Sequence, residues 1–456
     1  MLKDLKVEYR KNPIGLDVSP RFSWKLSGEL KDTIQESYQI QVIKDGKMSW
    51  DSGRVQSDQS ILVPYAGKAL EPMAEYLVKV NVWDNHGQMD DAAAAFETGL
   101  MTEDNWKAKW ITHRLPADET ACPVFVKRFH IKEEKIKQAR IYATSCGTYE
   151  MALNANKVGD MFMAPGWTSY HHRLQYQTYD ITSLLQKENE IALTVGNGWY
   201  KGYLGFVNEL DHYGSQTAIL AMIRLEYEDG SVDYFGTDTD WEVTTGVIIS
   251  SEIYLGETQD YTAKQKRYGN AVLFQKEGTI GAIVAQEAEP VRITKRFPVK
   301  EKIVTPKGEL VLDFGQNMAG FVEIKLPKLT GEKLVVRHGE TLDKEGNFYD
   351  ENLRSAVSAD TYIYNDDEED KVVIPHFTFH GFRYICIEGV DENVAADRFS
   401  ACALHTDMEE AGTFTCDNML VNQLQSNITW GERSNFLDIP TEKRMELQRR
   451  KDYRGY

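Results

Sequence analysis

Apolar and polar residues alternate along most of this chain of 456 residues, which is the pattern of β-strands that bury one face. Residues 38–42 show the alternation clearly, and the turn residues 45–46 follow them. Residues 76–82 repeat the pattern and lead to a second turn at 85–87. Short alternating runs separated by turns at this spacing are typical of β-sandwiches. We therefore expect an all-β fold.

Changes in this pattern divide the chain into four parts. Residues 1–100 predict a small sandwich, residues 101–290 a larger one of jelly-roll type, and residues 291–407 a third. The periodicity becomes helical only in the last part, 408–456. There the apolar residues with helical spacing are Met419, Leu420, Leu424 and Ile428, and the expected N-cap is Thr415 or Asp417. The sequence thus predicts three consecutive β-sandwiches followed by a short C-terminal helix.

Composition excludes several classes of function. The chain has 52 Lys and Arg against 70 Asp and Glu, a formal net charge of −18, which opposes binding to nucleic acids and anionic membranes. No apolar run is long enough to span a bilayer, and the first residues lack the apolar core of a signal peptide. The five cysteines form no CxxC pair and most lie in strand-like runs, so we expect reduced thiols and a cytoplasmic protein.

No motif for a nucleotide, flavin or catalytic metal is present, so no cofactor is expected. The segment GNGWYKG, residues 196–202, places Asn197, Trp199 and Tyr200 among three glycines. Such a segment has two interpretations. It forms either a loop on which a sugar ring stacks or a sheet corner whose aromatic residues belong to the core.

Several long segments together resemble one family, the bacterial α-L-rhamnosidases of glycoside hydrolase family 78. Residues 147–182 and 196–202 are similar to the accessory sandwich of these enzymes. The next sandwich of the family is similar to residues 312–326, 337–364 and 377–389. Residues 416–441 are similar to the helix and loop that lead into the catalytic domain. The resemblance implies an immunoglobulin- or fibronectin III-like first domain, a jelly-roll second domain and a concanavalin-like third domain.

The family's catalytic domain is an (α/α)6 barrel that hydrolyses terminal α-L-rhamnose with inversion. An inverting glycosidase needs a carboxylic acid and a carboxylate base roughly 6.5–9.5 Å apart. Residues 438–441 match the approach to the loop that carries the acid, but the Cys-Pro-Gln-Arg portion is absent and only Glu442 offers a remnant. We therefore expect a non-catalytic N-terminal fragment, truncated before the barrel.

Two alternatives remain open. The chain could be a free-standing protein that binds rhamnose-containing glycans, or it could work with a separately encoded catalytic barrel. Some related enzymes bind rhamnose together with calcium on the accessory sandwich. The candidate sugar-binding residues are Asp160, Trp167, Asn197, Trp199, Tyr200 and Glu257. A calcium site would use Asp160, Asn154 and Asn156, but oxygen ligands are sparse there for an ion that needs six or more.

Overall fold

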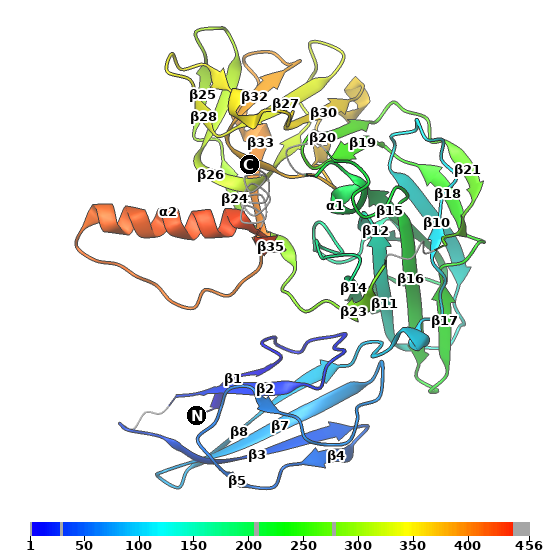
Figure 1. The fold of residues 1–456 in the computed structure, drawn as a ribbon, viewed down its shortest axis with the longest axis vertical. Helices are drawn as coiled ribbons and strands as arrows, with labels where there is room; N and C mark the ends of the chain where they lie inside the picture. Colours follow the sequence, from blue (N-terminus) through cyan, green and yellow to red (C-terminus); the bar gives the residue numbers. More distant parts are fainter. Residues whose placement is uncertain (1, 28–30, 205–208, 276–279, 441–456) are drawn as a thin grey trace, which may run out of the picture. The chain divides into compact units, whose positions relative to one another are not determined.

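The computed structural model describes residues 2–27, 31–204, 209–275 and 280–440 (Figure 1). Contacts group the chain into two compact units. The first consists of residues 1–107 with the short segments 175–179 and 283–286, and the second contains the rest. In the described residues strands far outnumber helices, and the prediction of an all-β fold is confirmed.

The first unit is a sandwich of two antiparallel sheets. One has the order β1-β2-β6 and the other β4-β3-β7-β8, with β5 paired to β3. The strands are β1 (Leu2–Val7), β2 (Arg21–Leu26), β3 (Gln35–Lys44), β4 (Lys47–Asp51), β5 (Val55–Gln56), β6 (Val63–Pro64), β7 (Glu75–Asp84) and β8 (Met89–Glu97). Tyr76, Val78, Val80 and Val82 are all buried, because they share the inner face of β7. The turns predicted at 45–46 and 85–87 join β3 to β4 and β7 to β8.

The second unit contains two further sandwiches. In the first of them, one sheet has the order β13-β12-β15-β10-β18-β21, and the facing sheet includes β22-β9-β16-β11 with β17 on β16. The strands of these sheets within the second unit are β9 (Ile111–Thr112), β10 (Pro123–His130), β11 (Ile136–Cys146), β12 (Thr148–Leu153), β13 (Asn156–Lys157), β15 (Glu188–Gly196), β16 (Ala218–Tyr227), β17 (Val232–Gly236), β18 (Glu242–Thr245), β21 (Arg267–Asn270) and β22 (Val272–Leu273). Strands β14 (Arg173–Asp180) and β23 (Ala282–Ala285) lie mostly in the short segments that are grouped with the first unit. The residues Ala139–Cys146 of β11 are all buried, because this strand lies in the middle of its sheet.

The other sandwich is built on a sheet whose main path is β19-β20-β30-β27-β32-β26-β33-β24, with β25 and β31 paired to β26. Its strands are β19 (Ile248–Glu252), β20 (Gly256–Asp260), β24 (Val291–Pro298), β25 (Glu301–Val304), β26 (Leu310–Lys325), β27 (Leu334–Gly339), β30 (Ala359–Ile363), β31 (Val372–Val373), β32 (His380–Glu388) and β33 (Phe399–Thr406); β28 (Thr341–Leu342) and β29 (Phe348–Tyr349) form a separate hairpin. Strands β19 and β20 precede residue 290, yet β20 pairs in parallel with β30.

The helix expected near the C-terminus is α2 (Met419–Asn435). Its cap is neither Thr415 nor Asp417. The side chain of Asn418 accepts hydrogen bonds from the backbone N–H groups of Leu420 and Val421, because it stands immediately before the first helical residue. After the helix, β34 (Phe436–Leu437) and β35 (Ile439–Pro440) form a tight hairpin. The only other α-helix in the described residues is α1 (Gly198–Lys201). No helix in the described ranges is both long and apolar enough to cross a membrane.

Candidate functional site

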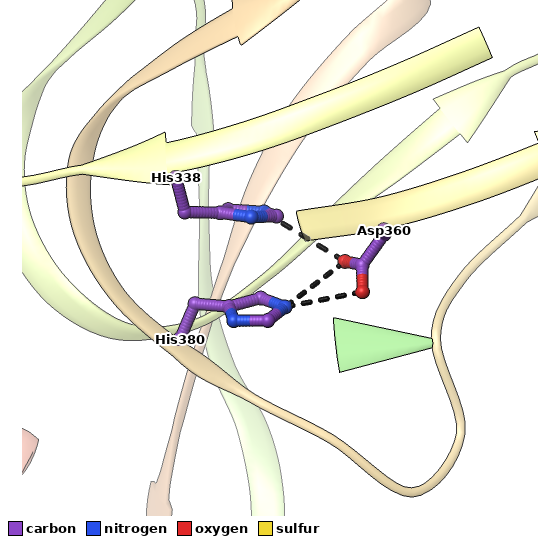
Figure 2. A group of neighbouring side chains, drawn as sticks. All are labelled: His338, Asp360 and His380. Atoms are coloured by element: carbon purple, nitrogen blue, oxygen red, sulfur yellow. Dashed lines mark hydrogen bonds and ion pairs between the residues drawn. The ribbon is translucent and has the colours of Figure 1, made fainter. Parts of the chain in front are cut away.

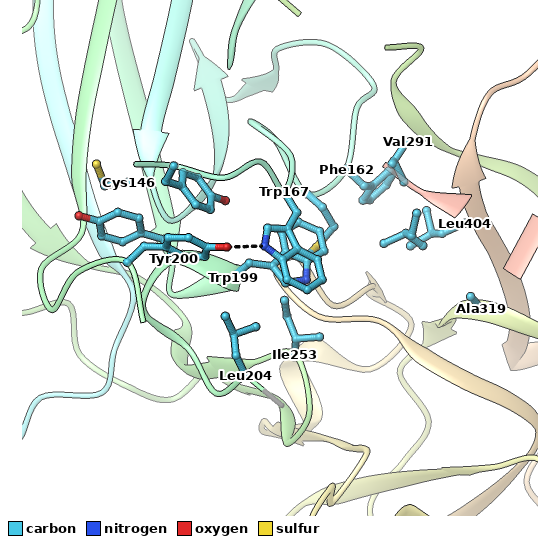
Figure 3. Packing of buried hydrophobic residues seen from close by; sticks show 14 of the residues in the cluster. Cys146, Phe162, Trp167, Trp199, Tyr200, Leu204, Ile253, Val291, Ala319 and Leu404 are labelled. Atoms are coloured by element: carbon cyan, nitrogen blue, oxygen red, sulfur yellow. Dashed lines mark hydrogen bonds between the residues drawn. The ribbon is translucent and has the colours of Figure 1, made fainter. Parts of the chain in front are cut away.

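The two tryptophans expected to contact sugar lie face to face. The rings of Trp167 and Trp199 are stacked, with centroids 5.6 Å apart and planes at 9° (Figure 3). Trp167 is 8% exposed and Trp199 is 2% exposed, so protein covers most of both rings. The indole N–H of Trp167 donates to the hydroxyl of Tyr213 at 3.3 Å. The stacking surface of each ring is therefore used by the other, and sugar binding by this pair stays a prediction.

These rings belong to a larger apolar cluster that joins the two sandwiches of the second unit. Figure 3 shows Trp167 and Trp199 between Tyr200 on one side and Val291, Ala319 and Leu404 on the other. Tyr200, another candidate sugar contact, is 3% exposed and its ring meets Tyr170 edge-on, with centroids 5.5 Å apart. The core interpretation of the GNGWYKG segment accounts for these contacts, because α1 carries Trp199 and Tyr200 into the junction.

Asn197 is held by a buried carboxylate. Its side-chain amide donates to Oε1 of Glu252 at 2.6 Å, and the other carboxylate oxygen accepts the backbone N–H of Tyr203 at 3.3 Å. Burial raises the pKa of Glu252 above its ordinary value. The pair links α1 to β19 and engages one of the two N–H donors of the Asn197 amide, so sugar binding by Asn197 stays a prediction.

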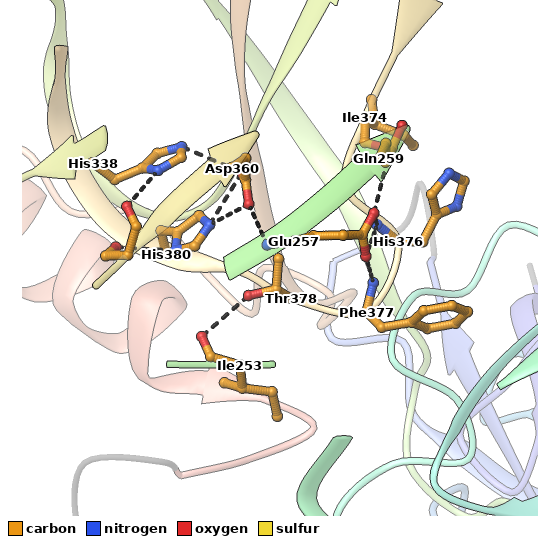
Figure 4. Close-up of polar contacts among 11 residues, drawn as sticks. Ile253, Glu257, Gln259, His338, Asp360, Ile374, His376, Phe377, Thr378 and His380 are labelled. Atoms are coloured by element: carbon orange, nitrogen blue, oxygen red, sulfur yellow. Dashed lines mark hydrogen bonds and ion pairs between the residues drawn. The ribbon is translucent and has the colours of Figure 1, made fainter. Parts of the chain in front are cut away.

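Glu257 lies at the centre of a polar network between the sandwiches (Figure 4). Its carboxylate accepts the backbone N–H groups of His376 at 3.1 Å and Phe377 at 3.0 Å, and the side-chain amide of Gln259 at 2.7 Å. Glu257 is 2% exposed, and this burial raises the pKa of its carboxyl group. The geometry is that of a carboxylate that satisfies buried backbone donors.

His376 connects this network to the jelly-roll sheet. Its Nδ1 lies 2.9 Å from Oε2 of Glu150, whose other oxygen is 2.9 Å from Nζ of Lys157. Burial alone would raise the pKa of Glu150, but the charges and hydrogen bonds of His376 and Lys157 outweigh it and lower this pKa to about 2. The bridge is therefore ionic and ties β12 to the segment before β32.

The residues proposed for calcium are engaged with protein groups. Asp160 pairs with Nε of Arg292 at 2.7 Å. The side-chain oxygen of Asn154 accepts the backbone N–H of Glu190 at 2.9 Å, and its amide donates to Asn189 at 2.9 Å. A calcium ion needs six or more oxygen ligands, and calcium binding at these residues stays a prediction.

A cavity of about 510 Å³ opens between the third sandwich and α2. Among its lining residues are Trp199, Gln316, Asn317, Glu340, Phe379, His380, Asn427 and Trp430. Two other cavities, of about 820 and 420 Å³, lie beside the jelly-roll sheets. Among the described residues, each of the three is lined by one carboxylate side chain: Glu340, Asp211 and Glu150 respectively.

Helix α2 exposes its apolar side chains. Leu420 is 81% exposed, Leu424 57% and Ile428 54%. On the opposite side Trp430 packs edge-on against Phe297, with centroids 5.4 Å apart. The helix is thus attached to the third sandwich on one side and leaves an apolar stripe, Leu420, Leu424 and Ile428, exposed on the other. The candidate remnant Glu442 lies outside the described residues.

Asp438 is a residue that sequence reasoning placed only as part of a loop. Its Oδ2 accepts the backbone N–H of Trp167 at 2.6 Å, and its own N–H donates to the hydroxyl of Thr406 at 3.0 Å. Desolvation raises the pKa of Asp438 to about 6. Asp360 and His380 were also missed, because their partners lie about twenty residues away along the chain. The strand alternation around His380 indicated only that one face is buried.

Four family models match successive parts of the chain. They describe a Rha78A-like N-terminal immunoglobulin domain (residues 2–102), an alpha-L-rhamnosidase N-terminal domain (134–301), a bacterial alpha-L-rhamnosidase concanavalin-like domain (303–405) and a bacterial alpha-L-rhamnosidase 6 hairpin glycosidase domain (409–445). The last match begins just before α2.

Curated proteins named alpha-L-rhamnosidase match nearly the whole chain. One from Streptomyces avermitilis is 28% identical, and the match covers 96% of this chain and 60% of that protein. One from Formosa agariphila is 33% identical, with 95% of this chain and 50% of that protein covered. The chain thus spans about half to three-fifths of the length of these relatives.

Solved structures of alpha-L-rhamnosidases also superpose on nearly the whole chain. The alpha-L-rhamnosidase of Streptomyces avermitilis complexed with L-rhamnose superposes with a TM-score of 0.89 at 27% identity, over 96% of this chain and 61% of that one. The alfa-L-rhamnosidase of Aspergillus terreus superposes with a TM-score of 0.87 at 33% identity, and the match covers 96% of this chain and 53% of that one. With four successive domain matches and relatives aligned over almost its full length, this chain belongs to the bacterial α-L-rhamnosidase family.

Proposed function

We propose that these residues form the non-catalytic N-terminal part of an α-L-rhamnosidase, an enzyme that hydrolyses terminal α-L-rhamnose from glycosides with inversion. The observation that carries this proposal is the exposed apolar stripe of α2 within residues 409–445, which match the 6 hairpin glycosidase domain. The three sandwiches supply a scaffold on which that domain is built. The chemistry belongs to residues of the helical domain.

The three cavities support this division of labour. Inverting hydrolysis needs one carboxylic acid to protonate the leaving oxygen and a second, opposed carboxylate to activate water. In the described part of the chain, each of these cavities offers one carboxylate side chain and lacks an opposed partner for it. Their walls can bind or position a ligand, but they do not provide an acid and base pair.

The test compares two proteins on 4-nitrophenyl α-L-rhamnopyranoside. One is the chain of 456 residues, and the other is a fusion of residues 1–440 to the remaining helical part of the Formosa agariphila relative. We expect the chain by itself to release no nitrophenol above the buffer rate, and the fusion to release it with inversion, observed by NMR. Enzyme-level release by the chain itself would contradict the proposal.

We also propose that the partner of the α2 stripe is a six-hairpin helical domain, whether covalently attached or supplied by another chain. The fusion protein tests the first case. Co-purification of the tagged chain with a separately expressed helical domain tests the second.

Binding of rhamnose by the sandwiches is the alternative function. Calorimetric titration of the chain with L-rhamnose distinguishes it, because saturable heat would show a sugar site independent of the helical domain. The burial of Trp167, Trp199 and Tyr200 and the pairing of Asp160 and Asn197 favour the scaffold function.

We propose a reducing compartment, such as the cytoplasm, for this protein. Cys122, Cys386 and Cys402 are buried free thiols, and Cys416 is an exposed one. Thiols of this kind persist where glutathione keeps them reduced. Denatured protein taken rapidly from cells should react fully with a maleimide without prior reduction.

A further inference from the structure

A chain of hydrogen bonds runs from Ser358 through His380 to Asp360 beside the 510 Å³ cavity. The hydroxyl of Ser358 lies 3.0 Å from Nδ1 of His380, and Nε2 of the same ring lies 3.1 Å from each carboxylate oxygen of Asp360 (Figure 2). Ser358 is 7% exposed, His380 3% and Asp360 2%. Ser358 and His380 both line the cavity, while Asp360 lies behind them.

The direction of each proton follows from the partners. Burial alone would raise the pKa of Asp360, but the charge and hydrogen bond of His380 outweigh it and lower this pKa, so the group is a carboxylate. A carboxylate only accepts hydrogen bonds, so Nε2 of His380 carries the ring proton. Nδ1 then holds a lone pair, and the hydroxyl of Ser358 donates to it.

The backbone holds Ser358 in an unusual conformation. Its φ is +50°, a region that residues other than glycine seldom adopt and that is common at functional sites. Its N–H donates to the carbonyl of Tyr254 at 3.1 Å, and its carbonyl accepts the backbone N–H of His338 at 3.0 Å. These bonds hold the backbone at Ser358, and the hydrogen bond to Nδ1 of His380 orients its side chain.

His338 supports the relay from the other side. Its Nδ1 donates to the carbonyl of Ser358 at 3.0 Å, and its ring stacks on His380 with centroids 3.9 Å apart and planes at 20° (Figure 4). The Asp360 oxygens are also held from behind, where the backbone N–H of Glu257 donates to Oδ1 at 3.0 Å. The carboxylate and the imidazole therefore have little freedom to turn away from each other.

A metal ion is the obvious competing explanation for two histidines and an aspartate. The possible ligand atoms of His338, Asp360 and His380 lie within 4.8 Å of one another. However, a metal binds an imidazole in the plane of the ring, along the nitrogen lone pair. Two stacked rings with centroids 3.9 Å apart and planes at 20° lie in separate, nearly parallel planes, so one ion at bonding distance cannot lie in the plane of both rings. The geometry fits proton transfer better than metal binding.

We propose that Ser358 is the nucleophile of an acyl-ester hydrolase site, with His380 as its general base and Asp360 as the residue that positions His380. The serine oxygen attacks the carbonyl carbon of an ester while Nδ1 of His380 takes the hydroxyl proton. The same proton passes to the leaving alcohol as the ester bond breaks. Water then attacks the acyl-serine, His380 takes its proton and returns it to the serine oxygen, and a carboxylic acid is released.

The cavity indicates the class of ester. Amide side chains of Gln316, Asn317 and Asn427 can bond to hydroxyl groups, and the rings of Trp199, Phe379 and Trp430 add apolar surface. Its volume of about 510 Å³ is in the range of small-molecule sites. Glu340 disfavours an anionic ligand. The substrate class is therefore a neutral sugar that carries a short O-acyl group.

The experiment uses the chain of 456 residues, a fluorophosphonate probe and 4-nitrophenyl acetate. Mass spectrometry should locate the probe on Ser358. Ser358→Ala should lower ester hydrolysis by at least about 100-fold. Ser231→Ala, which changes a serine in the turn between β16 and β17 and outside this cavity, should leave the rate within about twofold. The labelling needs no variant, so it decides the question even where a substitution impairs folding.

Asp360→Asn gives a second readout. A positioning role predicts a lower kcat with an unchanged KM, whereas a general loss of structure would change both together with the melting temperature. A probe that fails to label Ser358, an absence of turnover by the wild-type chain, or equal hydrolysis by wild type and Ser358→Ala would each overturn the proposal. None of these outcomes depends on rhamnosidase activity.

Discussion

The carboxylate of Asp438 accepts the backbone N–H of Trp167 at 2.6 Å, across 271 positions of the chain. This bond attaches the hairpin that follows α2 to the jelly-roll sandwich. Gly166 allows the carboxylate of Asp438 to approach the backbone this closely, because a Cβ at position 166 would lie only 2.6 Å from Oδ2 of Asp438. The backbone of Gly166 also has φ +97°, a conformation that favours glycine. Leu437, the neighbour of Asp438, is fully buried in the apolar cluster around Trp167. The hairpin that follows α2 is thus anchored on both sandwiches of the second unit.

Asp438→Asn should change how the stability of this anchor depends on pH. The pKa of Asp438 is raised from 3.8 to about 6, so the folded state binds this proton more tightly than the unfolded state. The wild-type anchor is therefore most stable below pH 4 and loses stability as pH rises to about 6, by at most about 3 kcal/mol. Asparagine can still accept the N–H of Trp167 but does not ionise, so the variant should lack this loss.

Hydrogen exchange of the Trp167 amide measures the effect, as protection factors corrected for intrinsic exchange at pH 4.5 and 7.5. Asp407→Asn, a change in an exposed aspartate paired with Arg292, is the matched control. The same pH dependence of protection in wild type and Asp438→Asn would contradict the role given to this carboxylate.

The exposed stripe of α2 should make the isolated chain self-associate. Leu424 and Ile428 are more than half exposed, so replacing both with glutamate costs little folding energy and removes apolar contact surface. We expect sedimentation velocity to show concentration-dependent association for wild type and a monomer for the double variant. Ser426→Glu adds one such charge at an exposed position of the helix outside the stripe and should associate like wild type. A wild-type chain that stays monomeric at every concentration would argue against an uncovered interaction surface.

Trp199→Ala should destabilise the second unit by about 3–5 kcal/mol, because it removes a large buried ring from the junction of two sandwiches. Trp199→Phe keeps most of the apolar surface and should cost less. Urea denaturation followed by circular dichroism measures both. If Trp199 instead served as a sugar platform, the alanine variant would lose affinity for L-rhamnose while its urea midpoint stayed near that of wild type.

The strand pattern could be predicted because it is local. The inner face of β7 is visible in the alternation of Tyr76, Val78, Val80 and Val82, and the turn at 45–46 is visible in its Asp-Gly pair. The roles of the aromatic residues could not be predicted. A tryptophan between glycines can face a sugar or a second tryptophan, and the local sequence is the same in both cases.

The polar networks around Glu257 and Ser358 could not be predicted from the sequence for a different reason. Glu257 meets backbone N–H groups 119 and 120 positions away, and Ser358 meets a histidine 22 positions away. The Ser358 contact depends on β30 and β32 both pairing with β27, and the Glu257 contact depends on the parallel pairing of β20 with β30. No periodicity in the sequence indicates this pairing, because β20 lies in a segment that reads as part of the preceding sandwich. Strand pairing over such a distance is decided by the packed fold and not by the local pattern.

Glu257→Ala should be among the most destabilising single changes in the chain. It leaves the buried N–H groups of His376 and Phe377 without their acceptor, and each unsatisfied donor costs about 1–3 kcal/mol. Glu257→Gln keeps one acceptor oxygen but points an amide at a donor, so we expect an intermediate loss. Glu188→Ala is the matched control, since its side chain is 75% exposed and its ion pair with His130 contributes under about 1 kcal/mol. Thermal denaturation ranks the three variants, and a Glu257→Ala protein as stable as Glu188→Ala would show that water or a rearranged loop satisfies those two donors.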